Sequence, residues 1–470
     1  MPTLNLHRVL PLKRSLVEVF RYLRDFDNIE QWDPGVFTAE RELIDPATNT
    51  PSFALQLNVL GRPVPMRYTL DICEPPSVNG AARLVLTGVG DGFTAIDTLT
   101  LSSTSPDSCT LDYRADISTA DVPGLLMPLL NWWGARLSDA AMTGLKGALE
   151  NDGPAYPGAL ARVAERLVLP GMINYTRRGY RQMPSRGLSR YLDGRRVGIS
   201  GVTSGLGLAC AQQLARLGAD LVLVGRGKAR LAQAADAIRP WASHDIDILC
   251  LEAELSSMTS TRALSEQLVA LARPLDVWIN NAGALFEAQA LTDEGIERTM
   301  AVNFVSPALL TQALAPTLAA RGGRIIQVVS GGLYTQGLAL DDMAFATEPF
   351  NGSKAYARAK RALLDVSRYW ATQHAGLGLH VMHPGWAATP GIASALPAFN
   401  KHLGKWLRNS RQGSDTAAWL ASHPTFEQGQ HSGEFWFDRA RRPTALLPGT
   451  ASSKDDVQAL ISWYEQQLSG

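Results

Sequence analysis

The fold of the longer half of the chain is decided by the stretch Arg196-Val-Gly-Ile-Ser-Gly-Val-Thr-Ser-Gly-Leu-Gly207, which leads into an apolar helical pattern ending near Leu217. The apolar residues at its start predict a buried strand, and the glycines permit a tight turn and close approach of backbone to a ligand. Amides at the start of a helix favour negative charge. Strand, glycine loop and helix together predict a site for the diphosphate of a dinucleotide.

From Arg195 onward predicted strands and helices alternate, which indicates an α/β Rossmann fold, a doubly wound parallel sheet. The second strand, residues 220–224, is followed by Gly225 and Arg226 and not by an acidic residue. A carboxylate there would bind the ribose hydroxyls of NAD, whereas Arg226 could pair with a 2′-phosphate. The sequence therefore favours NADP(H) over NAD(H) as the cofactor.

A tyrosine and a lysine lie one helical turn apart in the stretch Lys354-Ala-Tyr-Ala-Arg-Ala-Lys360, downstream of Ser330 at the end of the apolar run 325–329. The positive charge of Lys360 favours the phenolate of Tyr356, and the hydroxyl of Ser330 can hydrogen-bond a substrate oxygen. Alone, a Tyr-x-x-x-Lys pattern is common on exposed helix faces. Downstream of a dinucleotide loop, it indicates proton transfer.

Several motifs in a fixed order resemble the short-chain dehydrogenase/reductase family over residues 195–470. They are Gly201, Gly205 and Gly207, then Asn280-Asn-Ala-Gly283, Asn303, Ser330, Tyr356 with Lys360, and Pro384-Gly385 followed by Thr389. The passages 328–333, 356–361 and 383–391, together with 175–180, are similar to the branch of dehydrogenase/reductase family member 12.

The resemblance implies an oxidoreductase that interconverts a carbonyl and an alcohol on a hydrophobic substrate. Tyr356 would be the acid/base, Lys360 would lower its pKa and hold the nicotinamide ribose, Ser330 would orient the substrate oxygen, and Asn303 would support a water relay. The cofactor residues implied are Gly201, Thr203, Ser204, Gly205, Leu206, Gly207, Arg226, Glu254, Leu255, Asn281, Ala282, Gly283, Tyr356, Lys360, Pro384, Gly385 and Thr389.

The chain departs from the family pattern in three places. Ser200 replaces a threonine, Glu254 replaces an aspartate near the adenine, and the gap between Ser330 and Tyr356 is longer than usual. The acidic insertion 341–348 is a candidate rim of the substrate mouth.

Residues 1–150 predict a strand, a helix from Leu16 to Arg24 capped by Ser15, several alternating strands and a closing helix with an apolar stripe from Leu130 to Leu149. This order, with the segment 28–36, resembles the polyketide cyclase and START-like superfamily, an α+β helix-grip fold. The resemblance implies a cavity for a lipid or other hydrophobic molecule; a filled core is the alternative. Candidate cavity residues, equally consistent with ordinary core or rim positions, are His7, Tyr68, Trp132 and Trp133.

Residues 151–194 predict a linker with an amphipathic stretch at 160–169 and a cluster of arginines. Apolar residues beside cations also suit an anionic membrane surface, so contact through 160–196 stays open beside the favoured linker interpretation.

Basic and acidic residues balance at 44 each, which gives no support to a nucleic-acid partner. The four cysteines lack metal-ligand spacing and predict buried, reduced thiols, and no metal site is expected. No signal peptide or membrane-spanning run is recognisable, so we expect a cytoplasmic protein, with peripheral membrane attachment and a homo-oligomer left open. Two alternatives to the reductase remain, a lipid-transfer protein with a regulatory dinucleotide domain and a bifunctional cyclase-reductase.

Overall fold

The computed structural model describes residues 3–42, 50–59, 61–119, 127–150, 174–181, 183, 191–388 and 404–469. The chain forms two compact units; the described residues up to 150 belong to the first, and those from 174 onward belong to the second. Residues 174–181 and 183, which fall in the segment predicted as a linker, thus pack with the second unit. Each unit has its own hydrophobic core.

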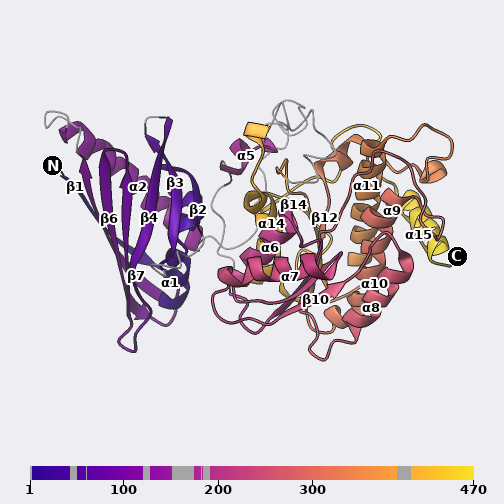
Figure 1. The fold of residues 1–470 in the computed structure, drawn as a ribbon, viewed down its shortest axis with the longest axis horizontal. Coiled ribbons are helices and arrows are strands. Elements are labelled where there is room, and N and C mark those ends of the chain that lie inside the picture. The colour runs from indigo at the N-terminus through magenta and orange to yellow at the C-terminus, as the bar shows by residue number, and fades with distance from the viewer. Residues whose placement is uncertain are drawn as a thin grey trace. The chain divides into compact units, whose positions relative to one another are not determined.

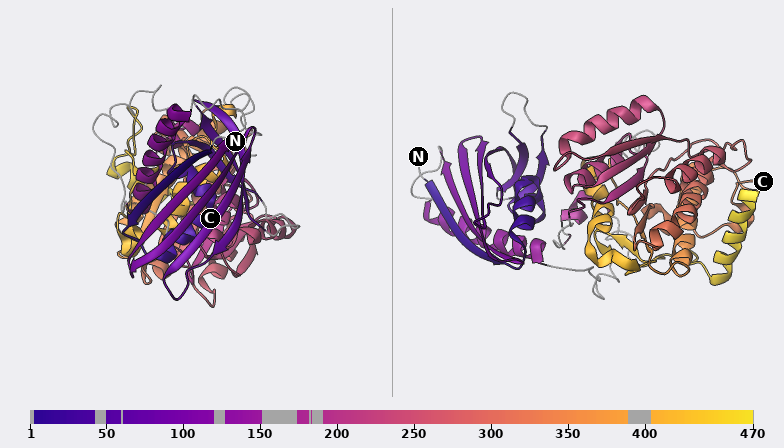
Figure 2. Two further views of the ribbon diagram at one scale, coloured as in Figure 1. Left: turned by 90° about the vertical axis from the view of Figure 1, so that its left-hand side faces the viewer. Right: turned by 90° about the horizontal axis from the view of Figure 1, so that it is seen from below.

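The first unit is a seven-stranded antiparallel sheet in the order β1-β7-β6-β5-β4-β3-β2, with α2 packed against it (Figure 1). The sheet is visibly curved in the second panel of Figure 2. Alternating strand residues supply one face of the core, as the period-two pattern predicts. The elements are β1 (Thr3–Leu12), α1 (Leu16–Arg24), the 3-10 helix η1 (Phe26–Gln31), β2 (Val36–Arg41), β3 (Ser52–Val59), β4 (Arg62–Glu74), β5 (Ala81–Gly90), β6 (Phe93–Ser105), β7 (Ser108–Thr119) and α2 (Met127–Glu150).

Local sequence signals in this unit are largely confirmed. The Ser15 side chain caps α1 by accepting a hydrogen bond from the Glu18 amide, and α1 has the predicted bounds. Among the four candidate cavity residues, Tyr68 is buried and Trp133 is half-buried. His7 is exposed and pairs with Asp112, and Trp132 is 56% exposed, so neither lies in the interior.

The second unit is an eight-stranded sheet in the order β10-β9-β8-β11-β12-β13-β14-β15, parallel except for β15. Helices α6, α7 and α14 cover one face, and α8, α10 and α11 cover the other (Figure 1). The elements are α5 (Arg177–Arg181), β8 (Arg196–Ser200), α6 (Gly205–Arg216), β9 (Asp220–Gly225), α7 (Lys228–Ile238), η3 (Arg239–Trp241), β10 (Ile248–Glu252), α8 (Met258–Val269), β11 (Val277–Asn280), α9 (Arg298–Met300), the π-helix η4 (Ala301–Val305), α10 (Ser306–Ala319), β12 (Arg324–Val328), η5 (Gly331–Thr335), η6 (Leu340–Asp342), α11 (Gly352–Ala371), β13 (Gly378–Met382), η7 (Gly404–Trp406), α14 (Ser410–Ser422), η8 (Pro424–Gly429), β14 (Phe435–Phe437), β15 (Ala440–Arg441) and α15 (Lys454–Ser469).

The prediction that all four cysteines are buried is wrong for two of them. All four are free thiols, but only Cys109 and Cys210 are buried. Cys73 and Cys250 are exposed; Cys73 lies at an outward-facing position of β4, and Cys250 lies on β10, the edge strand of its sheet. Among the described residues, no helix is long and apolar enough to cross a membrane, and no group of three His, Cys, Asp or Glu side chains could hold a metal ion.

Candidate active site

The glycine loop after β8 forms a cradle that side chains would fill. Gly201 and Gly205 have φ values of +73° and +58°, which favour glycine. A Cβ on Gly207 would lie 2.1 Å from the Gly201 carbonyl oxygen, so only glycine lets α6 start this close to the loop. The side chain of the N-cap residue Ser204 makes no capping hydrogen bond. The loop therefore fits a diphosphate held by the first amides of α6.

Asn281 and Ala282 hold the other side of this cradle. The Asn281 side chain donates to the carbonyl oxygens of Ser200 and Gly201, at 2.9 and 3.1 Å. The Ser200 hydroxyl accepts from the amides of Asn281 and Ala282, at 3.2 and 3.1 Å. The serine at this position thus retains a hydroxyl that joins the carboxyl ends of β8 and β11.

The residues expected near the adenosine part of the cofactor carry both positive and negative charges. Arg226 Nη1 lies 3.3 Å from the Glu254 carboxylate, and both side chains are well exposed. Hydrogen bonds from Ser256 and the charge of Arg226 help to lower the pKa of Glu254. Lys228 and Arg230 add two further exposed cations in the first turn of α7, which has no acidic residue there. Leu255 is buried beneath this surface.

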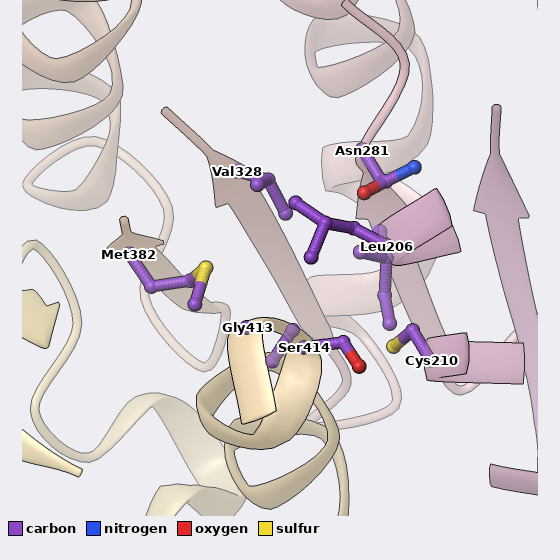
Figure 3. Close-up of a pocket in the computed structure, with 9 residues that line it drawn as sticks. Leu206, Cys210, Asn281, Val328, Met382, Gly413 and Ser414 are labelled. Atoms are coloured by element: carbon purple, nitrogen blue, oxygen red, sulfur yellow. The ribbon is translucent and has the colours of Figure 1, made fainter. Parts of the chain in front are cut away.

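A narrow pocket lies at the seam between α6, α14 and the ends of β12 and β13 (Figure 3). A Cβ on Gly413 would lie 2.6 Å from Leu206 Cδ2, so α14 can approach α6 only because Gly413 has no side chain. The pocket leaves no space for a water-sized molecule. We therefore treat it as a packing seam that fixes Leu206 and not as a ligand site. Its lining also includes Cys210, Ile279, Asn281, Val328, Met382, Ser414 and Ala417.

Asn303 is fully buried in the π-helix η4, an irregularity often found at functional sites. Its side-chain amide donates to the carbonyl oxygens of Ala284 and Thr299, at 2.7 and 2.9 Å, and its Oδ1 accepts from the Ala284 amide at 3.1 Å. A Cβ on Gly283 would lie 2.9 Å from that Oδ1 and 3.3 Å from Lys360 Nζ. Because Gly283 has no side chain, Asn303 Oδ1 and Lys360 Nζ can both lie close to its Cα.

Lys360 and Tyr356 face the same side of α11. Lys360 is 1% exposed, and its Nζ donates to the Val328 carbonyl oxygen at 3.0 Å. That Nζ lies 5.7 Å from the centroid of the Tyr356 ring. Burial lowers the pKa of Lys360 to about 7 and raises the pKa of Tyr356 to about 12. In the protein alone, the phenol is therefore protonated at neutral pH.

Ser330 follows the end of β12 by two residues, so it lies next to the contact between Lys360 and Val328. Its hydroxyl accepts from the Gly332 amide at 3.3 Å as the cap of η5. Pro384 and Gly385 follow β13, and the φ of Gly385 is +72°. The structure brings the carboxyl ends of β8, β11, β12 and β13 to one edge of the sheet, where ligands of this fold bind. Thr389 lies outside the described residues.

Comparisons with known proteins identify the family. A model described as short chain dehydrogenase matches residues 195–397. Dehydrogenase/reductase SDR family member 12 of Bos taurus is 35% identical over 303 residues, which cover 63% of this chain and 94% of that protein. The chain belongs to the short-chain dehydrogenase/reductase family. Members of this family are oxidoreductases of carbonyl and alcohol groups that use a nicotinamide dinucleotide.

Other relatives are named for apolar alcohols. Human retinol dehydrogenase 14 is 31% identical over 305 residues, covering 60% of this chain and 88% of that protein. Mouse polyprenol dehydrogenase is 32% identical over 247 residues, which cover 50% of this chain and 73% of that protein. A model of polyketide cyclase/dehydrase and lipid transport proteins matches residues 6–150, so the first unit is a START-like domain and the second has the dehydrogenase fold.

The sequence interpretation missed a polar cluster inside the first unit. Tyr113 donates a short hydrogen bond to the buried Asp97, and Tyr68 also hydrogen-bonds it. Burial raises the pKa of Asp97 and that of the neighbouring Asp33 to about 6 each. The alternation in β6 could have revealed Asp97, because it shares the inward parity of Leu99.

A second omission concerns Tyr175, whose ring packs against His383, Trp386 and Phe437. The segment 175–180 was identified only by resemblance. No local signal in the sequence places it beside Ser330, because the contact is made across more than 150 positions of the chain.

Proposed function

We propose that the protein reduces the carbonyl group of a hydrophobic substrate with NADPH, with Tyr356 as the proton donor. The observation that carries this proposal is that Asn303 and Lys360 meet at Gly283. The Tyr356 ring centroid lies 5.7 Å from Lys360 Nζ, and Ser330 follows Val328, whose carbonyl oxygen accepts from Lys360, by two residues. No purely binding role would require these four side chains together.

The bound cofactor would supply the hydride, and the chain would supply orientation and the proton. Ser330 would donate its hydroxyl to the substrate oxygen, and Tyr356 would transfer its phenolic proton to that oxygen as it gains negative charge. A phenol with a pKa of about 12 is protonated at neutral pH, which is the form that reduction requires. Lys360 would lower that pKa when protonated and hold the ribose, and Asn303 would order the water that returns a proton to the site.

NADP(H) is favoured over NAD(H) by the charges after β9. Arg226, Lys228 and Arg230 are exposed at the point where a 2′-phosphate would lie, and no acidic residue follows β9 directly. Glu254 pairs with Arg226 and would yield it to the phosphate. Arg226→Ala should lower kcat/KM for NADPH more than for NADH.

The test is NADPH oxidation with a panel of ketones, aldehydes and quinones. We expect Tyr356→Phe to abolish nearly all turnover and to retain NADPH binding, measured by the change in cofactor fluorescence. Turnover of Tyr356→Phe at the wild-type rate would refute the assignment of the proton donor.

The first unit would hold an apolar ligand for this reaction. Several apolar side chains on its inner face remain only half-buried, although others on the same face are fully buried. Partly exposed apolar side chains on this face suit contact with a hydrophobic molecule. The half-buried residues are Leu10, Leu57, Phe93, Tyr113 and Ile117. Mass spectrometry of small molecules that co-purify with the full chain would test this second role.

A further inference from the structure

Residues 174–176, which precede the dinucleotide fold, contact Arg408, the loop after β13 and the residue that follows Ser330. We propose that Tyr175 is a specificity-determining residue whose hydroxyl binds a second oxygen of the carbonyl substrate. This inference rests on the proposed reductase function and names the substrate class, a flat apolar carbonyl compound with a further oxygen near the reacting one.

The segment is held in place by a single buried arginine. The Arg408 guanidinium donates to the carbonyl oxygens of Asn174, Tyr175 and Thr176, at 2.7, 3.1 and 3.2 Å. It also forms two hydrogen bonds to the Asp438 carboxylate, at 2.5 and 2.8 Å. Arg408 is 1% exposed, so these bonds are shielded from water. The backbone on both sides of the Tyr175 side chain is therefore fixed.

The loop after β13 binds the same segment. The Trp386 amide donates to the Tyr175 carbonyl oxygen at 2.8 Å. A Cβ on Gly385 would lie 2.8 Å from that oxygen and 2.7 Å from Arg408 Nε. The glycine of the Pro384-Gly385 motif thus has a second role, because its missing side chain admits the segment to the active-site edge.

The Tyr175 ring ends beside the residue that follows Ser330. A Cβ on Gly331 would lie 3.3 Å from Tyr175 Cε2 and 3.5 Å from Cζ. The ring is held edge-on by His383, Trp386 and Phe437, with centroids 5.0, 5.7 and 5.3 Å away. The carbon that bears the hydroxyl is therefore positioned at the side of the site where the substrate oxygen is oriented.

The Tyr175 hydroxyl differs from that of a neighbouring tyrosine. Within the part of the chain that the structure describes, the Tyr175 hydroxyl has no hydrogen-bond partner. Tyr334, which packs on the same His383, donates its hydroxyl to the Pro443 carbonyl oxygen at 2.8 Å. A phenol held rigidly, half-buried and without a protein acceptor is suited to hydrogen-bond a ligand. The adjacent half-buried Trp386 extends the aromatic wall, which suits a flat substrate.

The experiment compares two flat tricyclic probes, 9,10-phenanthrenequinone, which has two adjacent carbonyl groups, and 9-fluorenone, which has one. Steady-state kcat/KM with NADPH is measured for the wild-type chain, Tyr175→Phe and Tyr334→Phe. Loss of one hydrogen bond predicts that Tyr175→Phe lowers the quinone-to-fluorenone ratio of kcat/KM about fivefold to tenfold. Tyr334→Phe, the matched removal of a phenol hydroxyl, should leave that ratio unchanged.

Equilibrium binding keeps the test independent of turnover. Binding of phenanthrenequinone is measured by fluorescence quenching in Tyr356→Phe with NADP⁺, and again with Tyr175→Phe added. A fivefold to tenfold weaker affinity in the double variant supports the role of Tyr175, whereas equal affinity overturns it. If the wild-type chain oxidises no NADPH with any compound of the ketone, aldehyde and quinone panel, the proposed reductase function is refuted. The binding measurement still decides the role of Tyr175 in that case.

Discussion

Replacing Lys360 by methionine should make the cofactor-free protein more stable at neutral pH. The amine is buried, and desolvation lowers its pKa from an ordinary 10.5 to about 7. Below pH 7 the folded protein must keep a desolvated ammonium, and the penalty is fully present. Between pH 7 and 10.5 the folded protein has lost the proton that the unfolded chain still binds, so the free energy of unfolding rises with pH.

The two pKa values set the size of the effect. A difference of 3.5 between 10.5 and 7 corresponds to about 5 kcal/mol below pH 7, and to about 4 kcal/mol at pH 7. Methionine removes that penalty, but it also removes the hydrogen bond to the Val328 carbonyl oxygen. An unpaired buried carbonyl costs about 1–3 kcal/mol. The net gain of Lys360→Met at pH 7 should therefore be about 1–3 kcal/mol, and it should vanish near pH 10.

Urea unfolding of the full chain at pH 6.5, 8 and 10 would measure this difference. The transition of the dinucleotide unit is recognised because NADP⁺ shifts it. Lys354→Met is the matched control, since Lys354 lies on the same helix but pairs at the surface with Glu348. An advantage of Lys360→Met that is absent at pH 6.5, or that grows with pH, would refute the reasoning. Activity of Lys360→Met should be lost even though stability is gained.

Two further predictions concern buried charges. Arg408→Met leaves the buried Asp438 carboxylate without its partner, so we expect the free energy of unfolding to fall by about 3–5 kcal/mol. Arg441→Met, which breaks the half-exposed pair with Glu434, is the control. Equal melting temperatures of the two variants would contradict this expectation. Burial raises the pKa of Asp97 from 3.8 to about 6, so the folded first unit retains a proton that the unfolded chain has lost. The stability of this unit should therefore fall by about 2 kcal/mol as pH rises from 4 to 7. Hydrogen exchange in β6, corrected for intrinsic rates, should reveal this fall in wild type and a flatter profile in Asp97→Asn.

The predictions that succeeded rest on local physics. The cap at Ser15 and the helix it starts were predicted to the residue, because capping and apolar spacing are read within a few positions. The glycines of the cradle were also recognisable, and the structure adds the reason that each is required. Gly207 faces a carbonyl oxygen of its own loop, whereas Gly283 faces Asn303 and Lys360, which lie far along the chain.

Contacts between distant segments could not be predicted in the same way. Arg408 lies more than 230 positions from the three carbonyl oxygens that it binds, and nothing in its neighbourhood indicates this role. The exposure of Cys250 depends on which strand forms the edge of the sheet, and only the topology reveals that β10 does. The inward position of Asp97 could be predicted from the alternation in β6. Its raised pKa could not, because it depends on how completely the folded unit buries the carboxyl group and on the two tyrosine hydrogen bonds that partly offset this burial.

The boundary of the dehydrogenase unit follows from the same long-range contacts. The matched family model starts at residue 195, yet Tyr175 packs against the loop after β13 and against Gly331. If the chain were cut at 195, Arg408 would keep Asp438 and lose its three carbonyl acceptors, and the edge beside Ser330 would lose its aromatic wall. The proposed catalytic side chains Asn303, Ser330, Tyr356 and Lys360 would all remain. If Tyr175 has the role proposed above, such a truncated chain should keep proton transfer and lose selection between the two probes, because the selecting side chain lies outside the recognised dinucleotide fold.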